Sequence, residues 1–335
     1  MKIDIFNHIF PKRFFDRMVE VLPKGRDMNK RVRAIPCIVD LDERFRIMDK
    51  FQDYVQIICI PNPPIESFGP PAITNELAKL ANDGMAELVQ KYPDRFPGFI
   101  ASLPMNDPDE NIKEATRAVK ELGAVGIQIF TNVNGRPLDK PEYLPIFDLM
   151  AKFDLPVWIH PARGADVADY KGEPKSHYEI WWTFGWPYET SVAMAHLVFS
   201  GLFDKHPKLK IITHHLGGMI PYFEGRVGPG WDQLGTRTSD EDYTLVLKTL
   251  KKRPFDYFKM FYADTATFGS KPATLCGLAF FGADHVLFAS DSPFDPEKGS
   301  AYIRWTIEII DKLDISKEER QAIYEGNARR LMKLR

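Results

Sequence analysis

Residues 209–218 read LKIITHHLGG, a short apolar run that ends in two histidines and is followed by two glycines. A continuous apolar run of this length is typical of a strand that is buried on both faces, as in a parallel sheet. Residues 155–163, LPVWIHPAR, and residues 286–294, VLFASDSPF, repeat the arrangement, with a histidine or an aspartate at or just after the end of the run. These stretches predict parallel strands that carry polar side chains at their carboxyl ends.

Apolar runs of this kind recur along the whole chain, at residues 2–7, 55–60, 99–103, 125–130, 157–160, 209–214, 259–263 and 286–289. Amphipathic stretches with apolar residues three and four apart lie between them, at 75–91, 109–122, 142–153 and 190–203. This alternation over more than about 250 residues favours a closed (β/α)8 TIM barrel, and no glycine fingerprint of an open doubly wound sheet follows the first run. We therefore expect an α/β fold with a single domain over residues 1–335, and we expect long βα loops at 23–39, 61–74, 163–187 and 226–243 and a helical tail at 317–335.

Composition excludes several classes of protein. The 335 residues include 44 Lys and Arg against 46 Asp and Glu, a formal net charge of −2, which argues against nucleic acid or an anionic membrane as the partner. The three cysteines, Cys37, Cys59 and Cys276, form no Cys-x-x-Cys pair and predict neither a disulfide framework nor a thiolate metal site. With no signal-peptide pattern and no apolar segment long enough to span a membrane, we expect a cytoplasmic protein.

Metal-competent side chains fall at the predicted carboxyl ends of the strands. Those side chains are His8, His160, His214, His215, Asp264 and Asp291. The carboxyl ends of barrel strands all open onto one mouth, so these residues are expected to converge there. Imidazole and carboxylate ligands suit a transition metal, with zinc as the first choice and manganese as the second.

Four stretches together resemble the decarboxylase branch of the amidohydrolase superfamily, the group of aminocarboxymuconate-semialdehyde decarboxylase and the resorcylate decarboxylases. They are KIDIFNHIFP at 2–11, GAVGIQIFTNVNGRPLD at 123–139, LPVWIHPAR at 155–163 with FSGLFDKHPKLKIITHHLGGMIPYFEGR at 199–226, and VLFASDSPF at 286–294. The resemblance implies a barrel that holds one divalent metal through His8, His160 and Asp291. It also implies that Asp291 and His215 handle protons, with His214 as the alternative to His215.

The sequence departs from this family at Phe6. The matching position is a histidine or a glutamate in the resembling enzymes, and phenylalanine cannot bind a metal. The site would then keep three protein ligands plus solvent, borrow Asn7, Asp4 or His214, or lose its metal. Asp4 shares a strand face with His8 but lies about 13 Å away at 3.3 Å per residue, too deep to chelate with it.

We expect a carbon–carbon lyase that removes CO2 without oxidation from a small aromatic or conjugated carboxylic acid. One alternative is a hydrolase of a lactone or similar ester, in which Asp291 is the base and His215 holds the oxyanion. Another is a degenerate barrel that binds a small molecule without catalysis.

Aromatic and basic side chains in the predicted loops are candidates for substrate binding. Trp181 and Trp182, with Phe184 and Trp186 nearby, follow the fifth strand, and Phe130 ends the fourth. Rings of this kind could stack on a planar substrate or form an oligomer interface, and a homodimer or homotetramer is expected from the resemblance. Arg163 and Arg33 could bind a carboxylate. Asp264 and His214 are expected to orient the residues that contact the metal.

Overall fold

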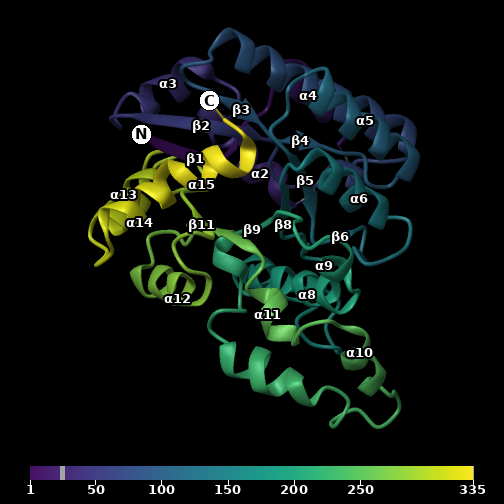
Figure 1. The fold of residues 1–335 in the computed structure, drawn as a ribbon. Helices are drawn as coiled ribbons and strands as arrows, with labels where there is room; N and C mark the ends of the chain where they lie inside the picture. Colours follow the sequence, from purple (N-terminus) through teal and green to yellow (C-terminus); the bar gives the residue numbers. More distant parts are fainter. Residues whose placement is uncertain (23–26, 335) are drawn as a thin grey trace.

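The computed structural model describes residues 1–22 and 27–334 (Figure 1). Residues 23–26 of the loop expected at 23–39, and Arg335 of the expected tail, lie outside the described residues. Among the described residues, no helix is long and apolar enough to cross a membrane.

Short parallel strands form the centre of the fold (Figure 1). Their bounds are β1 Lys2–His8, β2 Tyr54–Cys59, β3 Gly98–Phe99, β4 Ala101–Ser102, β5 Ile127–Phe130, β8 Val157–His160, β9 Ile211–Thr213, β10 Tyr262–Asp264 and β11 Val286–Leu287. They pair in the orders β1-β2-β3 and β4-β5-β8-β9-β10-β11, with every pairing parallel. A separate antiparallel hairpin joins β6 (Asn132–Val133) to β7 (Arg136–Pro137).

Backbone hydrogen bonds connect the two groups of strands into a ring. Ile100, between β3 and β4, donates its N–H to Ile58 at 2.9 Å. On the other side, Ile5 of β1 donates to the carbonyl of Phe288, just after β11, at 3.0 Å, and His8 donates to Ser292 at 2.8 Å. With β3 and β4 counted as one interrupted strand, the chain forms the expected (β/α)8 barrel.

The helices pack around the strands (Figure 1). Their bounds are α1 Lys12–Val21, α2 Asp27–Arg33, α3 Leu41–Met48, α4 Pro71–Lys91, α5 Pro108–Lys120, α6 Leu144–Phe153, α7 Ile180–Thr183, α8 Gly185–Phe199, α9 Leu202–Lys205, α10 Thr244–Thr249, α11 Pro254–Phe258, α12 Lys271–Phe281, α13 Ala301–Asp311, α14 Lys317–Gln321 and α15 Asn327–Met332. One buried apolar cluster lies between the helices and the strands. A second, which includes Ile5, Ile57, Trp158 and Leu287, fills the interior of the barrel below the mouth.

Several predicted boundaries are wrong for local reasons. The strand expected at 259–263 begins three residues later, because α11 extends to Phe258 and Lys259 caps it. The helix expected at 190–203 begins at Gly185 and is broken at Gly201, whose φ of 75° starts α9. The loop expected at 23–39 contains α2 and a 3-10 turn at Pro36–Ile38. The tail consists of α14, a π-helical turn at Ala322–Gly326 and α15.

Candidate metal and active site

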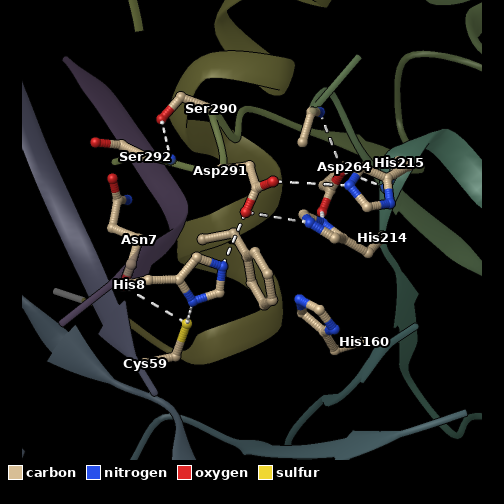
Figure 2. Close-up of polar contacts among 12 residues, drawn as sticks. Asn7, His8, Cys59, His160, His214, His215, Asp264, Ser290, Asp291 and Ser292 are labelled. Atoms are coloured by element: carbon tan, nitrogen blue, oxygen red, sulfur yellow. Dashed lines mark hydrogen bonds and ion pairs between the residues drawn. The ribbon is translucent and has the colours of Figure 1, made fainter. Parts of the chain in front are cut away.

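Four histidines and one aspartate converge at the carboxyl ends of the strands (Figure 2). Figure 2 shows Asp291 between His8 on one side and the pair His214 and His215 on the other, with His160 below them. Their side chains are almost completely buried, with His215 the most exposed at 10%. The predicted convergence of distant strand ends on one mouth is therefore present.

His8 is held at the end of β1 by contacts on both of its ring nitrogens. Its Nε2 forms a 2.8 Å hydrogen bond with Oδ1 of Asp291, and its Nδ1 lies 3.3 Å from Sγ of Cys59 on β2. The buried guanidinium of Arg44 donates to the backbone carbonyl of His8. These contacts fix the imidazole with Nε2 directed at the centre of the site.

His160 and His214 are oriented in a similar way. The Nδ1–H of His160 donates to the carbonyl of Pro161 at 2.7 Å, and Nδ1–H of His214 donates to Oδ2 of Asp264. The two rings are stacked, with their centroids 5.3 Å apart. Nε2 of His214 is buried, lies 3.5 Å from Oδ1 of Asp291, and forms no hydrogen bond with the described residues. The hydrogen bond from His214 to Asp264 therefore fixes the orientation of the His214 ring.

His215 differs from the other three histidines. The strand β9 ends at Thr213, and His215 adopts a left-handed backbone conformation with φ of 52°. Its backbone N–H donates to Oδ1 of Asp264 at 3.0 Å, whereas neither ring nitrogen forms a hydrogen bond with the described residues. Its Nε2 lies 3.7 Å from Oδ2 of Asp291.

If the strand continued through His214 and His215, their side chains would point to opposite faces. The strand instead ends at Thr213, before both residues. Because the chain turns at His215, the two imidazole centroids lie only 3.8 Å apart and both rings lie beside Asp291. Among the described residues, His214, His215 and Asp291 form a group whose possible ligand atoms all lie within 4.8 Å of one another.

The charges in the site are set by burial and by mutual contact. Burial lowers the pKa of His8, His160 and His215, which favours neutral imidazoles with lone pairs available to a metal. For Asp291, burial opposes ionisation, but contacts with His214, His215 and His8 hold the pKa of that carboxyl well below its usual range. For His214, burial favours the neutral form, but the carboxylates of Asp264 and Asp291 outweigh it and raise its pKa to about 9. In the absence of metal, one imidazolium therefore lies between two carboxylates.

Phe6 points into the same centre as His8. Its ring centroid lies 4.8 Å from that of His8 and 4.2 Å from that of His214. Asp4 points elsewhere, since its carboxylate accepts hydrogen bonds from Tyr54 at 2.7 Å and from the backbone N–H of Ser290 at 3.0 Å.

Asn7 also turns away from the centre. Its amide donates to the carbonyl of Asp4 at 2.9 Å. The pairing of β1 with β2 is irregular between Asp4 and Asn7, which explains why these two residues contact each other despite their odd spacing.

A cavity of about 430 Å³ opens over the site. The described residues that line it include His8, His160, Asp291 and the predicted Trp181 and Trp182. Its border also includes the aromatic residues Trp186, Phe268, Phe294 and Tyr302, the basic residues Lys30 and Arg31, the polar residues Asn62 and Glu179, and Ala34.

The other predicted binding residues lie behind or outside this lining. Phe130 contacts the ring of His160 with centroids 5.0 Å apart, and Arg163 forms a 2.9 Å ion pair with Glu189. Arg33 is exposed on α2.

Several residues that line the cavity were not predicted from the sequence. Some of them lie just after the carboxyl ends of strands, the same position that predicted the histidines. Asn62, Phe268 and Phe294 each follow the carboxyl end of a barrel strand within a few residues, in the loops after β2, β10 and β11. The expectations at the strand ends were limited to metal-competent residues, Phe130 and the tryptophan cluster. Arg31 and Tyr302 lie on α2 and α13, and no pattern in the sequence connects these helices to the mouth.

The fold and the site together define a parallel barrel protein that presents histidines and an aspartate, a ligand set suited to a divalent metal, at the carboxyl ends of its strands. The chain belongs to the amidohydrolase family, whose model matches residues 62–334. Two relatives that are decarboxylases confirm the resemblance of the sequence to the decarboxylases of this superfamily.

The chain is 33% identical to gamma-resorcylate decarboxylase of a Polaromonas species over 88% of this chain and 87% of that protein. It is 30% identical to 2-amino-3-carboxymuconate-6-semialdehyde decarboxylase of Dictyostelium discoideum over 88% and 82% of the two chains. Among solved structures, it is similar to a dihydroxybenzoic acid decarboxylase from Polaromonas with bound manganese and the inhibitor 2-nitroresorcinol, with a TM-score of 0.80, 29% identity, and coverage of 99% and 97%. Relatives of this protein are thus decarboxylases, and one of them binds a divalent metal.

Proposed function

We propose that the protein is a metal-dependent decarboxylase that removes CO2 without oxidation from a small hydroxylated aromatic acid. The observation that carries this proposal is the position of Asp291. Its carboxylate contacts three histidines and also lines a cavity bordered by Trp181, Trp182 and Trp186. The relatives' activity on resorcylate and muconate-type acids supports the same substrate class.

The residues of the site fit a divalent cation. The buried Nε2 of His214 has no hydrogen-bond partner among the described residues, and its orientation by an aspartate is typical of a metal-binding histidine. Imidazole and carboxylate donors suit both zinc and manganese, and the manganese in the related decarboxylase favours the second. When bound, such a cation would polarise the oxygen atoms of the acid and stabilise negative charge on them.

The chain's own residues supply the proton transfer. Ionised Asp291 accepts the proton of a hydroxyl group ortho to the substrate carboxylate and passes it to the ring carbon that bears that carboxylate. The carbon–carbon bond then breaks, CO2 leaves, and the electron pair of that bond restores the aromatic ring. The product oxygen takes up one proton from solvent, and His215, whose Nε2 lies 3.7 Å from Asp291, is positioned to relay it.

The lining of the cavity supports an aromatic substrate. Trp181, Trp182 and Phe268 offer faces and edges to a flat ring, and Lys30 and Arg31 add positive charge at its border. A hydrolase of a lactone would use the same histidines and aspartate, so the two activities are distinguished by product.

The test is an assay of CO2 release from 2,6-dihydroxybenzoate and salicylate by manganese-loaded protein, with hydrolysis of aromatic lactones measured in parallel. We expect CO2 release from an ortho-hydroxy acid and none from its meta-hydroxy isomer. Lactone hydrolysis without CO2 release would favour the hydrolase. Binding of the acids without turnover of either kind would favour a non-catalytic barrel.

We further propose that the chain works as a single domain in a homodimer or homotetramer in the cytoplasm. The segment around the tryptophans presents Tyr178, Phe184 and Tyr188 to solvent, at 94%, 70% and 54% exposure, which supports a contact between subunits there. The three cysteines are free, as in a reducing compartment. Light scattering of the purified protein and of Phe184→Asp tests the contact, since the variant should dissociate.

A further inference from the structure

This inference rests on the proposed metal-dependent function and concerns the ligand that Phe6 cannot supply. We propose that His214 replaces position 6 as the fourth protein ligand, so that the metal centre of this chain consists of His8, His160, His214 and Asp291. The geometry favours His214 over every other side chain near Phe6.

The first argument is a pattern shared by three of the imidazoles. The Nδ1 atoms of His8, His160 and His214 each contact a partner outside the centre, which is Cys59 Sγ, the Pro161 carbonyl and Asp264 Oδ2 respectively. With the outer nitrogen held in this way, Nε2 of each ring is the atom left to face a cation, and the outer partner fixes the orientation of the ligand. His214 is therefore oriented for metal binding in the same way as His8 and His160, the two histidines expected to bind the metal.

The second argument comes from the neighbours of Phe6. Asn7 and Asp4 hydrogen-bond to each other and to Tyr54 within the barrel interior, so neither offers an oxygen to the centre. The Phe6 ring instead fills the space beside His214, with its centroid 4.2 Å from the imidazole and at 47° to it. A histidine or a glutamate at position 6 would compete with His214 for the metal, whereas phenylalanine packs against the His214 ring.

The third argument separates His214 from its neighbour His215. The ring of His215 forms no hydrogen bond with the residues that the structure describes, and it lies between Trp186 and Phe268, with centroids 6.5 Å and 5.2 Å away. A residue that relays protons needs this freedom, whereas a ligand gains affinity from a fixed orientation.

The experiment measures manganese binding to chelator-treated protein by titration calorimetry and by the loss of the free manganese signal in electron paramagnetic resonance. His214→Gln removes the proposed ligand, and His215→Gln is the matched control on the adjacent residue. We expect His214→Gln to weaken manganese binding by more than the 10–100-fold typical of outer partners, and His215→Gln to change it less than about threefold. The double variant Phe6→Glu with His214→Gln returns a ligand to position 6 and should recover part of the lost affinity.

Circular dichroism of the metal-free proteins checks that each variant folds. Should His214→Gln fail to fold, a crystal structure of the manganese-loaded wild type decides, with the anomalous peak of the metal expected at bonding distance from His214 Nε2. Unchanged affinity in His214→Gln, or a metal bound to His215 in place of His214, would overturn the inference and leave the proposed function standing. Wild-type protein that binds neither manganese nor zinc would overturn the proposed function itself.

Discussion

Replacing Asp264 with asparagine tests how the site is oriented without touching a ligand. One carboxylate oxygen of Asp264 accepts the Nδ1–H of His214, and the other accepts two backbone N–H groups, from His215 at 3.0 Å and from Ala266 at 3.1 Å. An asparagine has only one acceptor oxygen, and the two backbone donors hold it on their side. The amide NH2 group then faces His214, which can accept its hydrogen bond only with a bare Nδ1 and with the proton on Nε2.

That tautomer cannot bind a metal through Nε2, so manganese affinity should fall although every ligand is still present. Loss of such an outer partner typically weakens metal binding 10–100-fold, or about 1.4–2.7 kcal/mol. Calorimetric titration of chelator-treated protein measures this directly. The matched control is Asp139→Asn, which alters a similar pair, Asp139 with His196 at 2.9 Å, away from the site. A folded Asp264→Asn protein that binds manganese as tightly as the control would refute the reasoning.

Three further predictions follow from other parts of the structure. His215→Asn should lower kcat for CO2 release about 10²–10⁴-fold and leave manganese affinity and KM close to the wild-type values, so a kcat within about threefold of wild type would contradict the relay role. Trp182→Leu should raise KM several-fold with little change in kcat, because the loss of one aromatic partner at the cavity is worth about 0.5–1.5 kcal/mol, as measured by initial rates. Burial raises the pKa of Glu66 from 4.5 to about 8, so between these values the folded protein keeps a proton that the unfolded chain releases, and stability falls as pH rises. Glu66→Gln should therefore have a higher free energy of unfolding in urea than wild type at pH 8 and nearly the same value at pH 5. Equal free energies of unfolding of the two proteins at both pH values would show that burial does not disfavour ionisation of Glu66.

The strands were predictable because each is buried on both faces. Residues 157–160 match β8 exactly in extent, and the other runs differ from the observed strands mainly at their ends. The length and apolar content of a run locate the buried part of a strand, whereas the residues at which the strand begins and ends depend on the elements before and after it. Lys259 was predicted to begin a strand but lies outside β10, because the preceding helix α11 continues to Phe258.

The convergence of the site was also predictable, since parallel strands of one barrel end at the same mouth. What the sequence could not provide was the direction of each side chain beyond the strand. His215 and Asp291 both have positive φ, 52° and 61°, where strand alternation no longer applies. The sheet irregularity that turns Asn7 towards Asp4 likewise depends on pairing with β2, which local sequence does not encode.

The exchange of a ligand between positions 6 and 214 is a consequence of barrel topology. The carboxyl ends of β1 and β9 open onto the same mouth although they are far apart in sequence, so a ligand can be lost from one strand and gained on another without moving the metal. Two conditions make such an exchange workable. The new ligand needs a fixed partner, which β10 provides through Asp264, and the vacated position needs a side chain that neither competes for the metal nor leaves a cavity, which Phe6 provides. Phe6 argues against a metal site when β1 is considered alone. It is compatible with such a site when the ligand on β9 and its partner on β10 are considered as well.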